Sequence, residues 1–303
     1  MHRFAHLAMA TQFEIHCTHP VENYARQASI CAFGAVDRLE QQLSRFIENS
    51  DISRINHLSA GEQTLIGYET MQCLQLALFM SRETGGAFDV SIGTAFESLE
   101  LIPNEFTVCA HANGTRLDLG AIGKGYAVDR AAEVLEDWEV EQLLIDAGCS
   151  SVLALQPPSG RKDWPLTVSV PGKARGDVLA HIAARQRALG ASGIQKQNHI
   201  LDPRTQVPVR SRRAAWVSAP RQILTDISRQ AEVEPSPAAV ADALSTAFMI
   251  LPPKEIQQYC CRYPGMEAWI LEQDFMHFGT PKKNHGLHGF HRFRDMLKFV
   301  KSV

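Results

Sequence analysis

Residues 117–131 read LDLGAIGKGYAVDRA and place three glycines and a lysine between a short apolar run and a helix that we expect to begin near Tyr126. The first turn of a helix has N–H groups without intrahelical partners, and glycine lets another group approach the backbone closely. The pattern therefore suits an anion such as a pyrophosphate. It matches neither the Walker pattern GxxxxGK[ST] nor the Rossmann pattern GxGxxG. Glycine-rich turns also begin many helices that bind no ligand, so these residues alone leave both interpretations open.

A carboxylate and a hydroxyl lie four residues apart in ADALSTAF, residues 241–248. On a helix, Asp242 and Thr246 would share one face. They offer hard oxygen ligands, which suit a Mg²⁺ ion that keeps waters and substrate phosphate in its other positions. The same spacing is also typical of a solvated or capping pair on a surface helix.

A histidine precedes a proline-containing turn in ASGIQKQNHILDPRT, residues 191–205. His199 and Asp202 flank an apolar pair there. Histidine has an unperturbed pKa of about 6.5, so His199 can act as a general base if it reaches a substrate proton. The segment DPRT is also an ordinary turn, and a single histidine more often packs or lies on the surface.

The segment ETGGAFDVSIG, residues 83–93, begins with a helix end. Gly85 and Gly86 are typical of helix termination, and this explains most of the pattern. Residues 87–90 would also suit a wall against which a planar ring lies, and Asp89 is the polar residue that helix termination leaves unexplained.

These residues must be positioned by a core of helices and short strands. The apolar spacing of helices occurs at residues 28–46, 71–78, 127–138 and 240–251. Short strands are expected at residues 142–148, 151–156, 166–170, 214–219 and 267–272. Helices interspersed with runs of strands indicate an α+β or mixed α/β architecture. The polar segment 227–240, ISRQAEVEPSPAAV, is predicted to form an exposed loop.

Composition narrows the class of protein. A chain of 303 residues with 45% hydrophobic content can bury one large core or two closely packed ones, and its net charge of −3 gives no general case for nucleic-acid binding. The seven cysteines are odd in number and contain no CxxC, which argues against a disulfide framework or a zinc site and favours a reducing compartment. We find no secretory signal and no run of about 18 apolar residues, so we expect a cytoplasmic protein without a membrane span.

Six segments occur together in an order that resembles the FAD:protein FMN transferase family, known as ApbE. The segments are AMATQFEI (8–15), SDISRIN (50–56), TGGAFDVSIG (84–93), LDLGAIGKGYAVDRA (117–131), SGIQKQNHILDPRTQVPV (192–209) and ADALSTAFMIL (241–251). The resemblance implies an α+β, ApbE-like (T-fold-like) architecture, in which two sheet-bearing halves enclose FAD. It covers most of residues 7–251, and we expect a flavin transferase domain at residues 1–276.

The resemblance also implies a reaction. FAD and Mg²⁺ bind, the pyrophosphate is cleaved, FMN passes to a Thr or Ser hydroxyl of an acceptor flavoprotein, and AMP leaves. The turn from Gly120 to Gly125 would hold the pyrophosphate, with Lys124 as a point charge. Asp242 and Thr246 would bind the metal together with a backbone carbonyl of the 121–123 turn, assigned to Ala121. His199 matches the family's catalytic histidine.

Flavin contacts follow from the same motifs. The residues assigned to them are Met9, Thr11, Phe46, Ala87, Phe88, Asp89 and Ser192. Several positions depart from the family pattern: Ala10, Cys149 and Gln206 stand where the family has glycine, Gly123 stands where it has alanine, and the segment SGIQKQN lacks the family's aromatic residue after SG. Two alternatives to transfer therefore stay open, namely an FAD pyrophosphatase that gives FMN and AMP, and an FAD-binding protein without turnover. The expected partner is the acceptor flavoprotein, and a homodimer is a possible assembly.

The C-terminal segment 277–303 lies outside the resemblance. Phe290, Phe293, Leu297 and Val300 share one helical face, and basic residues occupy the others. We predict a basic amphipathic extension that either covers the protein's own core or contacts a partner or a membrane surface.

Overall fold

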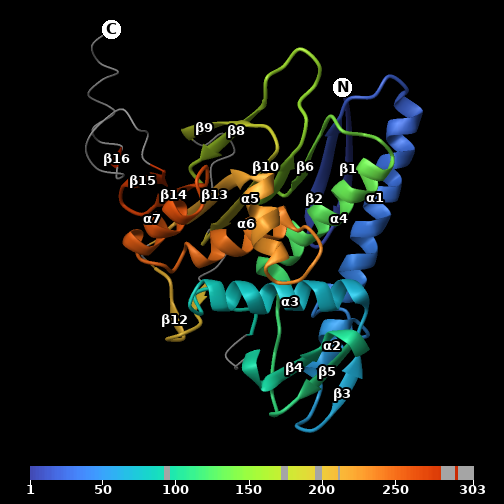
Figure 1. The fold of residues 1–303 in the computed structure, drawn as a ribbon, viewed down its shortest axis with the longest axis vertical. Coiled ribbons are helices and arrows are strands. Elements are labelled where there is room, and N and C mark those ends of the chain that lie inside the picture. The colour runs from blue at the N-terminus through green and yellow to red at the C-terminus, as the bar shows by residue number, and fades with distance from the viewer. Residues whose placement is uncertain (92–95, 172–176, 195–199, 211, 281–290, 293–303) are drawn as a thin grey trace.

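The computed structural model describes residues 1–91, 96–171, 177–194, 200–210, 212–280 and 291–292 (Figure 1). Its centre is a nine-stranded antiparallel sheet with the order β1-β2-β6-β7-β10-β13-β14-β15-β16. The strands of this sheet are β1 (His2–Ala8), β2 (Thr11–Cys17), β6 (Leu143–Ala147), β7 (Ser151–Ala154), β10 (Arg187–Gly193), β13 (Ala214–Pro220), β14 (Glu267–Leu271), β15 (Phe275–Gly279) and β16 (His291–Arg292).

Most of the helices cover one face of this sheet. The helices are α1 (Glu22–Leu43), α2 (Asp51–Asn56), α3 (Tyr68–Glu83), α4 (Gly123–Asp137), α5 (Arg221–Arg229), α6 (Pro237–Ala247) and α7 (Pro253–Arg262). Figure 1 shows α1, α4 and α6 side by side against the sheet, with α3 running across the end of this layer. Helix α6 contacts both α4 and the strands β10 and β13, so it lies at the centre of the molecule.

Smaller elements complete the architecture. They are the sheet β3 (Gln63–Leu65), β5 (Thr107–Ala110) and β4 (Leu99–Ile102), the hairpins β8 (Trp164–Ser169) with β9 (Val178–Ala184) and β11 (Leu201–Asp202) with β12 (Val207–Pro208), and the 3₁₀ turns η1 (Phe96–Ser98), η2 (Pro103–Glu105) and η3 (Leu119–Ala121). The mixed helix and sheet class expected from the sequence is confirmed. That FAD lies between two halves stays a prediction.

Two hydrophobic cores lie on the two faces of the large sheet. Strand β13 shows why, because successive side chains of a strand point to opposite faces. Ala215 and Val217 pack into the core under the helices, whereas Trp216 packs into a second core together with Trp164 of β8 and Ile182 of β9. The hairpin β8–β9 therefore covers the face of the sheet that the helices leave open.

The four predicted helical segments and the five predicted strands are present in the structure, with two corrections nearby. Helix α4 begins at Gly123 rather than near Tyr126, because the 3₁₀ turn η3 leads directly into it. Residues 227–240 form an exposed loop only in their middle part, where Gln230, Glu232 and Glu234 are exposed. Helix α5 extends to Arg229 and α6 begins at Pro237, and Val233 and Ser236 between them are buried.

The division of the chain at residue 276 stays a prediction. Strand β15 runs from Phe275 to Gly279, and most of the segment 277–303 lies outside the described residues. None of the helices that the structure describes combines the length and the apolar character needed to cross a membrane.

Candidate functional site

Helices α4 and α6 bring the predicted metal-ligand pair beside the glycine-rich turn. Asp242 is 2% exposed, and its Oδ2 accepts a hydrogen bond from the backbone N–H of Gly125 at 3.1 Å. The Lys124 Nζ lies 3.9 Å from the same oxygen and donates to the carbonyl of Gly120 at 2.9 Å. The carboxylate of α6 therefore faces the first turn of α4, and two residues of that turn contact it.

Close packing of backbones makes this arrangement possible. A Cβ added to Gly125 would overlap the carbonyl group of Ala238, and one added to Gly190 would overlap the carbonyl group of Ala241. Helix α6 is thus in direct backbone contact with α4 on one side and with β10 on the other. Gly125 therefore has a role in helix packing and in binding Asp242, and its predicted role in making room for a phosphate stays a prediction.

Three hydroxyl groups continue the site along α6. Ser192, near the end of β10, places its Oγ 2.8 Å from Ser245 Oγ and 2.9 Å from Thr246 Oγ1. Thr246 lies one helical turn beyond Asp242, as the spacing predicted. Ser192, a predicted flavin contact, is therefore in direct contact with a predicted metal ligand.

The donor set fits a hard cation. Burial raises the pKa of Asp242, and Lys124, the Gly125 N–H and Ser151 oppose that rise. A buried carboxylate needs a compensating positive charge, and Lys124 is not within hydrogen-bond distance. Among the described residues no group of three or more His, Cys, Asp and Glu side chains is placed to hold a metal. The Asp242 carboxylate and the Thr246 hydroxyl fit Mg²⁺ in the type of their donor atoms. That they bind it together with the carbonyl of Ala121 stays a prediction.

An exposed aromatic side chain stands beside the glycine-rich turn. Asp118 accepts hydrogen bonds from the Gly120 N–H at 2.9 Å and from Arg45 Nε at 2.8 Å. The guanidinium of Arg45 lies 4.2 Å from the ring centre of Phe46, whose side chain is 79% exposed. Asp118 and Arg45 thus tie Phe46 to the turn. Sequence reasoning missed both; Asp118 lies within the quoted motif, but nothing in the sequence marks Arg45.

The turn between β1 and β2 reaches the same end of the sheet. Met9 and Ala10 have φ of 51° and 56°, and together they form a two-residue hairpin turn. Thr11 packs against Gly148, because a Cβ added to Gly148 would overlap the hydroxyl of Thr11. Strand β2 pairs with β6, β6 with β7, and β7 with β10. The β1–β2 turn, the turn at Cys149 and the end of β10 that carries Ser192 therefore lie at the same end of the sheet. Met9 and Thr11 are therefore brought to the same sheet end as the α4–α6 site.

The segment after α3 is confirmed as a helix end. Gly85 and Gly86 have positive φ, and the Gly86 N–H returns to the carbonyl of Ser81 at 2.8 Å. Ala87 and Phe88 are fully buried in the core under the helices. Asp89 accepts from the Ser91 N–H at 2.7 Å, and burial raises its pKa. The assignment of residues 87–89 to the flavin stays a prediction.

The predicted base His199 lies outside the described residues. Beyond it, Asp202 accepts hydrogen bonds from the backbone and side chain of Arg204, whose guanidinium lowers the pKa of that carboxyl. Asp202 is therefore engaged within its own turn. That turn approaches the end of α3, since a Cβ on Gly86 would lie 3.5 Å from Arg204 Cγ.

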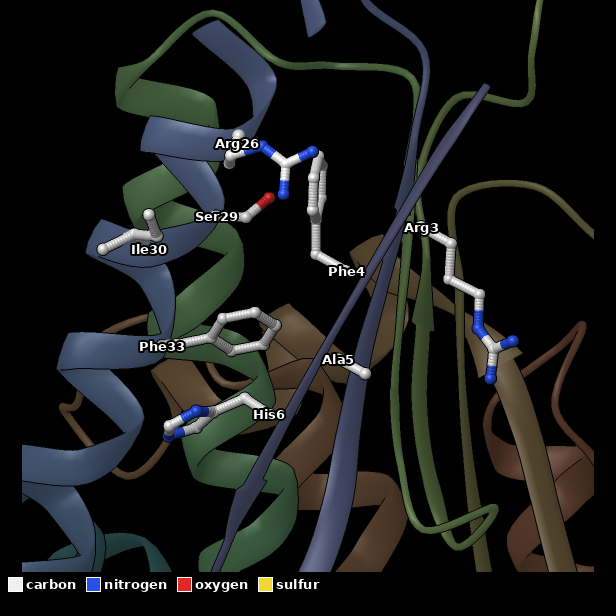
Figure 2. Close-up of a pocket in the computed structure, with 8 residues that line it drawn as sticks. All are labelled: Arg3, Phe4, Ala5, His6, Arg26, Ser29, Ile30 and Phe33. Atoms are coloured by element: carbon white, nitrogen blue, oxygen red, sulfur yellow. The ribbon is translucent and has the colours of Figure 1, made fainter. Parts of the chain in front are cut away.

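A groove between β1 and α1 contains none of the predicted site residues (Figure 2). In it the guanidinium of Arg26 lies 5.2 Å from the ring centre of Phe4, and His6 stacks on Phe33 at 5.0 Å. Two of its side chains have acidic partners on the neighbouring elements, namely Asp37 for His6 at 2.6 Å and Glu14 for Arg3. The groove is thus separate from the site at α4 and α6.

Comparison with known proteins shows the family to which this fold and these motifs are similar. The ApbE family profile matches residues 9–107 and 94–270. A FAD:protein FMN transferase of Treponema pallidum is 21% identical over 80% of this chain and 76% of its own length, and one of Buchnera aphidicola is 21% identical over 57% of this chain and 62% of its own. The structure of the flavin transferase ApbE from Vibrio cholerae superposes with a TM-score of 0.75 at 18% identity and covers 92% of this chain and 96% of the other. The chain belongs to the ApbE family.

Proposed function

We propose that this protein transfers FMN from FAD to a Thr or Ser hydroxyl of an acceptor flavoprotein, in a Mg²⁺-dependent reaction that releases AMP. The observation that carries the proposal is the buried Asp242, which faces Lys124 and the first turn of α4 and has Thr246 one turn away on the same helix face. Membership of the ApbE family and the FAD:protein FMN transferases among its relatives support the same reaction.

The chain's own residues would bind and orient the pyrophosphate. The Lys124 Nζ lies 3.9 Å from Asp242 Oδ2. Lys124 would therefore contact phosphate oxygens that are bound near this carboxylate. The turn at Gly120 and the start of α4 add backbone dipoles whose positive end faces the phosphates. Asp242 and Thr246 would hold Mg²⁺, which would supply positive charge to neutralise the charge that develops on the phosphoryl oxygens.

The transfer itself exchanges one phosphorus–oxygen bond for another. The acceptor hydroxyl oxygen forms a bond to the phosphorus of the FMN moiety, the bond from that phosphorus to the bridging oxygen breaks, and AMP leaves with the bridging oxygen. The hydroxyl proton passes to a base, for which we propose His199. Phe46, exposed beside the turn, would offer its ring to the flavin or the adenine.

The deciding experiment mixes the protein with FAD and Mg²⁺, with and without an acceptor flavoprotein, and follows AMP release and the mass of the acceptor. We expect AMP only when the acceptor is present, together with a mass gain of one FMN. AMP without an acceptor would replace the proposal with FAD hydrolysis. Bound but intact FAD under every condition would leave an FAD-binding protein.

Replacement of the predicted base separates chemistry from binding. His199→Ala should lower the rate of acceptor labelling by about 10²- to 10⁴-fold, because general-base catalysis typically contributes that much, while FAD affinity stays nearly unchanged. His111→Ala is the matched control, since His111 is exposed and pairs with Glu100 in the small sheet. Normal labelling by His199→Ala would remove His199 as the base.

A further inference from the structure

Helix α6 carries the Asp242–Thr246 pair, yet its first turn is capped by a residue of another helix. The side chain of its N-cap residue, Ser236, makes no capping hydrogen bond and donates to the carbonyl of Glu234 instead. The N–H groups of Ala238 and Ala239 donate to the two carboxylate oxygens of Asp129, each at 2.9 Å. Asp129 belongs to α4 and is 2% exposed. One buried carboxylate thus satisfies two of the N–H groups that a helix start leaves unpaired.

A second contact ties the same two helices one turn further along. Gly125 lies four residues before Asp129 on α4, and its N–H binds Asp242, which lies three to four residues after Ala238 and Ala239 on α6. The contacts at Asp129 and at Gly125 are therefore about one helical turn apart along α4 and also along α6. A shift of α6 by one residue, about 1.5 Å, would break both contacts at once.

Neighbouring residues of α4 hold the segment that leads into α6. The Arg130 guanidinium donates to the carbonyl of Pro235 at 2.6 Å and pairs with Glu133 at 2.8 Å. Burial raises the pKa of Asp129 to about 7, and the two N–H groups and Arg130 oppose that rise. Asp129 thus lies in a site that is unfavourable for its charge but complementary in hydrogen bonding.

A buried cation holds the opposite end of α6. Arg212 is 5% exposed, and its Nη1 donates to the carbonyls of Phe248 and Leu251 at 2.5 and 2.8 Å. Its guanidinium also pairs with Glu272 at 2.8 Å. An anionic group at the start of a helix and a cationic group at its end both complement the helix dipole. The Asp242–Thr246 pair lies between these two fixed ends.

We propose that Asp129 is a positioning residue for the metal-ligand pair: by capping α6 from α4, it fixes the register in which Asp242 and Thr246 face Lys124 and the glycine-rich turn. The inference rests on the proposed function, because it assigns Asp242 and Thr246 to a cation. Residues that orient metal ligands typically change metal affinity by 10- to 100-fold when they are replaced. Arg212 acts in the same way from the other end of the helix.

The test is Asp129→Asn, measured by titration of the full-length protein with Mn²⁺ in the presence of FAD. Asparagine keeps the shape but presents an NH₂ group to one of the two N–H donors, so one hydrogen bond is lost. We expect the dissociation constant for Mn²⁺ to rise roughly tenfold, and the Mg²⁺ concentration that gives half-maximal labelling to rise with it. FAD affinity in the absence of divalent cation should stay unchanged.

Asp51→Asn is the matched control. Asp51 is also a buried carboxylate that accepts two hydrogen bonds near the start of α3, from the Gly67 N–H at 2.8 Å and from Thr70 Oγ1 at 2.6 Å, and it accepts a third from the Arg54 guanidinium. We expect it to lower the melting temperature about as much as Asp129→Asn does and to leave Mn²⁺ affinity unchanged. Equal losses of Mn²⁺ affinity in the two variants, or no loss in Asp129→Asn, would overturn the inference.

Two further outcomes are distinguishable. If Asp129→Asn does not fold, Arg212→Lys tests the other end of α6, because lysine cannot reproduce the fork to Phe248 and Leu251; unchanged Mn²⁺ affinity in that variant would then overturn the inference. If the wild-type protein binds no Mn²⁺ with FAD present, the metal part of the proposed function fails first, and the positioning role falls with it.

Discussion

Two regions of this molecule differ in how well their backbone tolerates a side chain in place of glycine. Around α6, Gly125 and Gly190 touch the backbone of the helix directly, and an added Cβ would overlap the carbonyl groups there. Ala10 and Cys149, in turns at one end of the large sheet, and Gln206, in the turn of the separate β11–β12 hairpin, occupy the left-handed region, with φ of 56°, 56° and 59°. A left-handed backbone accepts a side chain at a cost of about 1–2 kcal/mol. Overlap with a packed backbone, in contrast, is relieved only if the backbone itself moves.

This difference explains the departures from the family pattern. By the motif resemblance, Ala10, Cys149 and Gln206 are expected to stand where the family has glycine, and all three have positive φ. Gly148, directly before Cys149, has a φ of 62° and in addition packs against Thr11, where an added Cβ would overlap the hydroxyl. The chain keeps glycine at that position. The departures therefore indicate strained turns and leave the packing of the α4–α6 site intact.

The largest expected effect is that of Gly190→Ala. Its Cβ would overlap the carbonyl of Ala241, next to Asp242, so β10 and α6 would have to move apart. Overpacking of this kind typically costs 1–3 kcal/mol, and we expect about 3 kcal/mol in the free energy of unfolding, measured with urea. Mn²⁺ affinity should fall with it, because the displaced segment carries Asp242.

Gly34→Ala is the control for that substitution. Gly34 lies within α1, and the nearest atom to an added Cβ is the tip of the Arg38 side chain at 3.7 Å. Alanine in a helix interior is more favourable than glycine by about 1 kcal/mol, so this variant should be slightly more stable than the wild type. A loss of stability as large as that of Gly190→Ala would mean that backbone contact at α6 is not what distinguishes the two positions.

The second expected effect has the opposite sign. Cys149→Gly should raise the free energy of unfolding by about 1 kcal/mol, because glycine adopts φ of 56° without the steric cost of a Cβ. The hydrogen bond from the residue's N–H to Asp146 at 2.7 Å is a backbone contact and stays. Ala10→Gly offers an independent repeat in the β1–β2 turn. Destabilisation in both variants would contradict the account of the departures as strain.

Sequence patterns predicted the local part of the site well. Asp242 and Thr246 share a helix face because four-residue spacing fixes that relation within one helix, and the glycine-rich turn does lead into a helix. The helix start at Gly123 was placed three residues late. The exposed loop expected at residues 227–240 is confirmed only in its middle part. The Pro235 carbonyl and the Ala238 N–H find partners on α4, which no local pattern shows.

Long-range relations were beyond the reach of the sequence. The ion pair of Arg45 with Asp118 joins residues 73 positions apart and ties Phe46 to the turn. The hairpin turn at Met9 and Ala10 carries none of the Asn-Gly or Asp-Gly signals that mark such turns. The reason for Gly125 lies on α6, more than 100 residues away in the chain. In each case the partner is set by the fold and by no nearby residue.

The smallest expected effect concerns charge near the α4–α6 contact. Burial raises the pKa of Glu133 to about 7; Arg130 opposes this rise, whereas Glu69, Glu234 and Glu136 add to it. The folded protein therefore holds this proton more tightly than the unfolded chain, and Glu133 makes stability fall as pH rises from about 4.5 to about 7.

In Glu133→Gln this contribution is absent, so stability should decline less between pH 5 and pH 8. The difference should be on the order of 1 kcal/mol, because the side chain is 40% exposed and solvent screens its charge. The decline should persist in part, since the pKa of Asp129 is raised as well. Urea unfolding at a series of pH values measures it, with Ala10→Gly as the comparison, because that substitution removes no titratable group and should shift the whole curve by one constant amount. A Glu133→Gln curve parallel to that of the wild type would show that burial does not favour the neutral form of the Glu133 carboxyl. The two regions would then differ only in steric contact.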